Sequence, residues 1–168
     1  MQRRSLLKLG VAGAAVLALG GGAAALLQPG VVDSRLSPAA REVFAAVGRG
    51  VLDGTLPQDA TDRARAIDSL LPRIDALVAG LPPHAQAELS QLLALLAMAP
   101  GRRALAGLAT NWRDASVGEL QAALQDMRMS SLAMRQQAYH ALHDIVSGAY
   151  FSDASTWGAM GYPGPVAV

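Results

Sequence analysis

Two histidines and an aspartate are the residues whose spacing could serve chemistry. His140, His143 and Asp144 follow i, i+3 and i, i+4 spacing, which places them together on one face of a helix. A zinc site needs at least three protein ligands, and no other His or paired carboxylate motif accompanies these residues. His84 directly follows Pro83 at a helix start and is expected in solvent. We therefore predict no metal site, and an enzyme relying on His140, His143 and Asp144 is the least favoured function.

Other chemical motifs do not supply an active site. The chain has no cysteine, which excludes disulfides, iron–sulfur clusters, thiolate zinc sites, c-type haem attachment and a cysteine nucleophile. It lacks G-x-S-x-G and G-x-G-x-x-G, and Gly20-Gly21-Gly22 lies within the N-terminal segment. Arg102-Arg103 could bind an anion at a helix start, although an exposed pair making surface contacts is the favoured interpretation. We predict no catalytic and no cofactor-binding residue.

The N-terminus has the pattern of an export signal. Arg3 and Arg4 precede Leu6, Leu7 and Lys8, and no charged residue follows from Leu9 to Val32. A basic start, a weakly hydrophobic Gly- and Ala-rich stretch and small residues near its end are typical of a signal, and the paired arginines indicate the twin-arginine type that exports folded proteins. We predict residues 1–28 as this signal.

The fate of the signal has two alternatives. Ala23-Ala24-Ala25 offers a cleavage site of the A-x-A type, which is the favoured outcome. The uncharged run is also long enough to span a bilayer as an uncleaved anchor. The predicted location is therefore the periplasm, with contact to the inner membrane through the N-terminal segment if the signal is retained.

Charge argues against a polyanionic partner. The net charge is +1, and residues 29–168 carry eleven arginines, no lysine and thirteen acidic side chains. Nucleic acid would demand a cluster of basic residues, and none is present. We exclude nucleic acid as a partner.

Composition and periodicity predict an all-α fold. The chain is 52% hydrophobic and rich in Ala and Leu, the residues with the best helix propensities. We expect a linker at 29–36 and a single helical domain at 37–168, built as a small bundle of about five helices after the signal helix. The helices are expected at 38–52, at 60–79 with a kink or split at Pro72, at 84–99 as the central helix, from 117, and up to about 149. Pro100-Gly101 should break the third, Arg102 to Leu108 could add two turns, and a loop follows over 110–116.

The last segment differs from everything before it. The chain has seven aromatic residues, and four of them fall within residues 150–162, a stretch that also carries glycines and is followed by Pro163, Gly164 and Pro165. Large aromatic side chains are enriched at binding hot spots, so this irregular tail, 150–165, suits partner docking. The alternative is a lid that places Trp157 and Tyr162 in the protein's own core. The predicted partner-binding residues are Tyr150, Phe151, Trp157, Gly161, Tyr162, Pro163 and Gly164.

The C-terminal half resembles a known family. The stretches "NWRDAS", "MRMSSL", "QAYHALHDIV" and "AYFSDASTWGAMGYPGP", with the twin-arginine start, resemble the small exported subunits of flavin-dependent dehydrogenases of the glucose–methanol–choline class, such as the gluconate 2-dehydrogenase subunit 3-like proteins. The resemblance covers roughly residues 80–165 and is most specific at Trp157 and at Gly161-Tyr162-Pro163-Gly164. Known members often have a longer insertion before the Trp, whereas residues 152–156 here are compact.

The resemblance implies a non-catalytic accessory subunit. The large subunit of such complexes carries FAD and the chemistry, often lacks its own export signal and travels folded with the small subunit. Electrons then leave through a cytochrome c subunit or another acceptor. The expected function is therefore to bind, stabilise and co-export a flavoprotein through the twin-arginine translocase, with no cofactor in this chain. The rival of another class is a stand-alone periplasmic protein that binds an apolar ligand between its helices.

Overall fold

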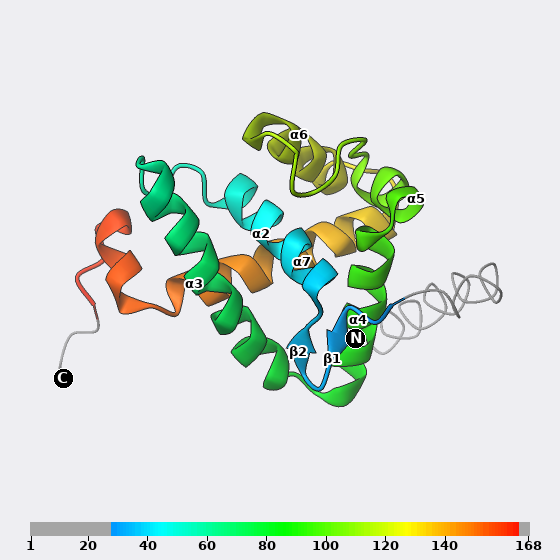
Figure 1. Cartoon of the computed structure of the whole chain (residues 1–168), viewed down its shortest axis with the longest axis horizontal. Coiled ribbons are helices and arrows are strands. Elements are labelled where there is room, and N and C mark those ends of the chain that lie inside the picture. The colour runs from blue at the N-terminus through cyan, green and yellow to red at the C-terminus, as the bar shows by residue number, and fades with distance from the viewer. Residues whose placement is uncertain (1–27, 165–168) are drawn as a thin grey trace, which may run out of the picture.

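The computed structural model describes residues 28–164, and this part of the chain is mostly helical (Figure 1). Its six α-helices are α2 (Pro38–Val51), α3 (Ala60–Ala79), α4 (Pro83–Ala97), α5 (Ala99–Gly101), α6 (Val117–Arg128) and α7 (Ala133–Phe151). A hairpin pairs β1 (Val31–Val32) with β2 (Arg35–Leu36), η2 (Arg102–Ala106) is a π-helical turn, and η3 (Ala154–Met160) is a 3-10 helix. The predicted all-α bundle is confirmed.

Helix starts follow from side-chain capping. The Ser37 hydroxyl accepts a hydrogen bond from the N–H of Ala40, and Pro38 occupies the first turn, where its missing N–H costs nothing. At the start of α6, Ser116 and Glu119 form a complete capping box. Both helix starts agree with the sequence-based prediction because these bonds satisfy backbone donors that the helix itself leaves unpaired.

Helix α2 is at the centre of the bundle and contacts α3, α4, α6 and α7 (Figure 1). Small residues permit this: the side chains of Ile67 and Leu70 lie over Gly48, and those of Leu120 and Leu124 lie over Gly50. The prediction that the 84–99 helix is central is wrong. Of that helix only four side chains are buried: Leu89, Leu93, Ala94 and Leu96.

Helix α3 continues through Pro72 as one helix, so the split that was one of the two predicted outcomes at this proline does not occur. Proline removes one helical N–H donor, so the carbonyl of Asp68 loses its usual partner. Both residues lie on the exposed side of α3, where water can hydrate that carbonyl. The opposite face of the helix keeps Ile67 and Ile74 buried in the core.

The predicted linker at 29–36 contains an ordered hairpin. Its Asp33–Ser34 turn takes left-handed φ angles of 50° and 59°, as the type I′ hairpin turn requires at both central residues. The N–H of Val31 donates to Ser90 Oγ at 3.0 Å, and the N–H of Leu36 donates to Asp75 Oδ1 at 2.9 Å. These side chains on α4 and α3 hold the hairpin on the bundle.

The break after α4 lies at Met98, whose backbone is extended, rather than at Pro100-Gly101 as predicted. Pro100 belongs to the first turn of α5, a position that tolerates proline. Gly101 passes so close to the carbonyl of Leu95 that a side chain there would clash with it. The chain therefore turns back sharply on itself before η2.

The repeat at sevens of Leu132, Tyr139 and Val146, with Leu142 and Ala149, predicts a buried stripe on the last helix, and the structure confirms it only in the second half of α7. Leu142, Val146 and Ala149 are buried as predicted, and Tyr139 is half-buried. Leu132 is 62% exposed, because α7 begins after it and it lies outside the helical periodicity. Within residues 28–164, no helix is both long and apolar enough to cross a membrane.

Candidate functional site

The aromatic tail, defined here as residues 150–164, begins in the last turn of α7 and continues into η3. Figure 1 shows it in orange and red at one edge of the bundle, beyond α3. Pro165, the last residue of the predicted docking segment, lies outside the described residues. The tail is not irregular as predicted, because Ala154–Met160 forms a 3-10 helix that the Asp153 side chain caps.

Tyr150 and Phe151 belong to the bundle. Tyr150 is 5% exposed, and its hydroxyl donates to the carbonyl of Thr55 at 3.3 Å. Phe151 is half-buried against the core, and the two rings meet edge to face at 5.1 Å between centroids. Their aromatic surface is largely used inside the protein, so they anchor the tail to α7.

Trp157 and Tyr162 form a separate cluster outside the bundle core. The half-buried Trp157 donates its indole N–H to the carbonyl of Phe151 at 2.8 Å and meets the Tyr162 ring edge to face at 5.3 Å. Gly161 and Gly164 take positive φ angles of 70° and 97°, which let the chain curl back over the indole. The alternative of a lid that buries both rings in the core does not hold, because neither ring belongs to the core and Tyr162 is 48% exposed.

The outer surface of this cluster is open. Tyr162 is 48% exposed, and Gly161 and Pro163 are also exposed. The cluster therefore presents a preformed aromatic surface whose shape depends on local hydrogen bonds rather than on burial in the core.

One ion pair ties the tail to α3. Arg73 Nη1 lies 2.7 Å from Asp153 Oδ2, and the N–H of Ser155 donates to Asp153 Oδ1 at 2.9 Å. Hydrogen bonds from Ser155, and to a lesser extent the charge of Arg73, hold the pKa of Asp153 below its ordinary value. The carboxylate thus caps η3 and links it to the bundle.

This arrangement predicts an acid-dependent loosening of the tail. Because the folded pKa of Asp153 is lowered, its stabilising contribution is present above the ordinary aspartate pKa and is lost as pH falls through the lowered value. We expect hydrogen exchange of the Trp157 indole N–H, followed by NMR relative to its intrinsic rate, to accelerate over that range. Arg73→Gln should accelerate it already at neutral pH.

The control is Glu119, whose pKa is lowered by its hydrogen bonds with Ser116 and Thr110 in the α6 capping box. It titrates on the acid side as well but lies away from the tail, so Glu119→Gln should leave Trp157 exchange unchanged. Exchange that does not respond to protonation of Asp153 would contradict the tether.

The three residues with metal-like spacing do not converge. His143 Nδ1 lies 3.0 Å from Oδ1 of the adjacent Asp144, and His140 is exposed. The Tyr139 ring contacts both imidazoles, stacking on His143 at 5.4 Å between centroids and meeting His140 edge to face at 5.3 Å. In the part of the chain that the structure describes, no group of three or more His, Asp or Glu side chains is placed to hold a metal ion.

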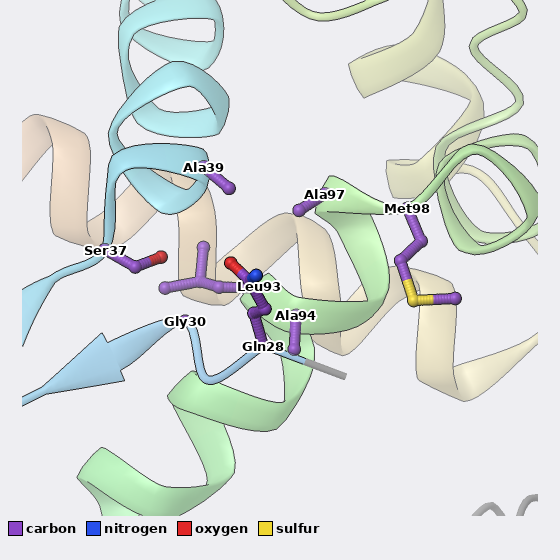
Figure 2. A pocket seen from close by; sticks show the side chains of 8 residues that line it. All are labelled: Gln28, Gly30, Ser37, Ala39, Leu93, Ala94, Ala97 and Met98. Carbon is purple, nitrogen blue, oxygen red and sulfur yellow. The ribbon is translucent and has the colours of Figure 1, made fainter. Parts of the chain in front are cut away.

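An apolar cleft lies between the start of α2 and the end of α4 (Figure 2). Its volume is about 190 Å³ and its lining residues are Gln28, Gly30, Ser37, Ala39, Leu93, Ala94, Ala97 and Met98. Pockets for small organic ligands usually measure about 300–1,000 Å³. The cleft is small for the apolar ligand that the alternative function requires.

A second, more polar cleft shares Ala39 and Ala97 with the first. Its volume is about 310 Å³, and its remaining lining residues are Glu42, Arg102, Asn111, Trp112, Arg113 and Asp114. Arg102 is 5% exposed, which corrects the prediction of an exposed Arg102-Arg103 pair, while Arg103 is exposed. Trp112 lies in the predicted loop at 110–116 and is nevertheless 4% exposed.

The predicted signal residues Arg3, Arg4, Leu6, Leu7 and Lys8 lie outside the described residues. No family model, curated protein or solved structure matches the chain significantly. The accessory-subunit assignment therefore remains a prediction from the resemblance.

Proposed function

We propose that this protein is a non-catalytic small subunit that binds, stabilises and co-exports a flavin-dependent dehydrogenase to the periplasm. The observation that carries the proposal is the cluster of Trp157 and Tyr162, which stands outside the core with an exposed outer surface. Such amphipathic rings, fixed in place before binding, lose little conformational entropy in a complex and commonly dominate its affinity.

The N-terminal pattern supports the export part of the proposal. A twin-arginine signal is suited to cargo that must fold before it crosses the membrane. A helical domain without a cofactor seldom needs that route for itself, whereas a flavoprotein that acquires FAD in the cytoplasm does. The small subunit would act as a chaperone that supplies the export signal, and FAD would reside in the partner.

The experiment that tests the proposal follows the partner's location. The chain is expressed with a flavin-dependent dehydrogenase of the same organism, and the flavoprotein is assayed in periplasm and cytoplasm. We expect periplasmic, active flavoprotein with the wild-type chain and almost none with Arg3→Lys/Arg4→Lys, because twin-arginine export depends on the paired arginines.

The control is a cytoplasmic assay of the same strains. Flavoprotein that accumulates folded in the cytoplasm with the Arg3→Lys/Arg4→Lys chain would locate the defect in export rather than in folding. An active periplasmic flavoprotein in cells that lack this chain would overturn the proposal.

A further inference from the structure

Arg102 is a buried cation without an acidic partner among residues 28–164. Its side chain lies in η2, the residue is 5% exposed, and no Asp or Glu of residues 28–164 approaches it within ion-pair distance. Its Nε donates to the carbonyl of Leu108 at 3.3 Å and its Nη2 donates to that of Ala109 at 3.4 Å. Both bonds are longer than the usual range of about 2.7–3.2 Å for an N–H···O hydrogen bond.

The remaining donor group of Arg102 is available to the polar cleft. Among the described residues, Nη1 has no hydrogen-bond partner. Every fully buried side-chain nitrogen or oxygen there does have a partner, so Nη1 is not fully buried. Nη1 therefore has access to solvent, and the cleft that Arg102 lines is the opening next to it. A buried guanidinium keeps its charge, so the inner end of the cleft is positive.

The other charged groups around the cleft do not cancel this charge. Glu42 on α2 is already ion-paired with Arg113. Asp114 is exposed and accepts a hydrogen bond from the Asn111 amide at 3.4 Å. Charges in water are screened far more than a buried one, so Arg102 dominates the potential at the inner end.

We propose that the polar cleft between α2, η2 and the 110–114 loop binds a carboxylate group on Arg102. A carboxylate oxygen can accept a charge-assisted hydrogen bond from Nη1, and the cleft volume of about 310 Å³ accepts a small acid or the end of a peptide. The acidic groups at the rim, Glu42 and Asp114, disfavour a dianion such as phosphate. The proposal uses no residue of the aromatic tail and is independent of the proposed function.

The experiment monitors Trp112, which lines the same cleft. The full chain carrying Trp157→Phe has one indole N–H signal in its NMR spectrum, and it is titrated with acetate, with the neutral analogue acetamide and with inorganic phosphate. We expect acetate to shift the Trp112 signal saturably, acetamide to leave it unchanged and phosphate to bind more weakly than acetate. Arg102→Gln should weaken acetate binding at least about tenfold, as expected for loss of a charge-assisted hydrogen bond.

The matched control is Arg103→Gln, which removes the exposed neighbouring charge and should change acetate binding less than about twofold. A peptide with a free C-terminal carboxylate, compared with its amide, identifies the source of the group. Tighter binding of the peptide than of acetate indicates a protein chain, and equal binding indicates a small acid.

Two results would overturn the proposal: no saturable acetate shift, or an Arg102→Gln protein that binds acetate like its parent. If Arg102→Gln does not fold, the nuclear Overhauser contact between the acetate methyl group and the Trp112 indole in the Arg102-containing protein decides. Absence of that contact would also exclude the site.

Discussion

Replacing Trp112 by alanine is expected to lower the free energy of unfolding by about 3–5 kcal/mol, the usual cost of truncating a buried tryptophan. The side chain is 4% exposed, and its indole N–H donates to the carbonyl of Leu96 at 2.7 Å near the end of α4. Its own carbonyl accepts a hydrogen bond from Arg49 on α2 at 2.7 Å. Trp112 thus connects the 107–116 loop to α4 and α2 by hydrogen bonds. Removing its side chain leaves a cavity in the core.

Trp157→Ala is the matched control, because it removes the same side chain from the tail. Trp157 is half-buried and packs mainly on Tyr162 and the tail backbone, so we expect a cost below about 1 kcal/mol. The free energy of unfolding of both variants is measured by urea denaturation. The unfolding is followed by circular dichroism, because each variant lacks one of the two tryptophans that a fluorescence measurement would use. Equal destabilisation by the two substitutions would contradict the division between core and tail. Trp112→Phe should fall between them, because the Leu96 carbonyl loses its donor.

Helix starts were predictable because capping is local. Ser37 with Pro38, and Ser116 with Glu119, specify the first turn of a helix through residues only three positions apart. The hairpin at 31–36 was missed because its turn lacks glycine. Asp33 and Ser34 take left-handed φ angles there, and side chains of distant helices hold the strands.

The polar cleft could not be predicted, because its members are brought together only by tertiary packing. Arg102 and Trp112 look like loop and surface residues in the sequence, and both are buried since η2 and the following loop fold back onto α4. The available signal was the single tryptophan in a polar stretch, since a tryptophan outside a helical stripe is more often buried than solvated. The position of α2 at the centre was equally hidden, because it depends on how closely Gly48 and Gly50 let neighbours approach.

Composition identifies the aromatic tail, but it does not show that the tail has one part packed on the bundle and one part outside it. Tyr150 and Phe151 continue the period of α7 and pack on the bundle, whereas Trp157 and Tyr162 follow the helix end at Ser152. A helical period carries information only while the helix lasts. It therefore separates anchoring aromatic residues from exposed ones only once the end of the helix is known.

Replacing Trp157 and Tyr162 together by alanine is expected to weaken association with the proposed flavoprotein partner by on the order of 100-fold or more, with the helical content unchanged. Hot-spot aromatic residues contribute about 2 kcal/mol or more each, and neither ring lies in the bundle core. Association is measured by titrating the purified chain into the flavoprotein. Tyr150 is unsuitable for this test, because its removal would disturb the bundle itself.

The matched control removes exposed apolar surface elsewhere. Met129 and Leu132 are 69% and 62% exposed at the junction of α6 and α7, away from the C-terminal end of α7 where the tail begins. Met129→Ser/Leu132→Ser should therefore bind the flavoprotein like wild type if the tail is the docking element. The reverse result, with tail variants binding normally and junction variants failing, would keep the accessory-subunit function but move its contact to the α6–α7 junction. If both variants bind the flavoprotein like wild type, the exposed aromatic surface of the tail is no longer an argument for a partner.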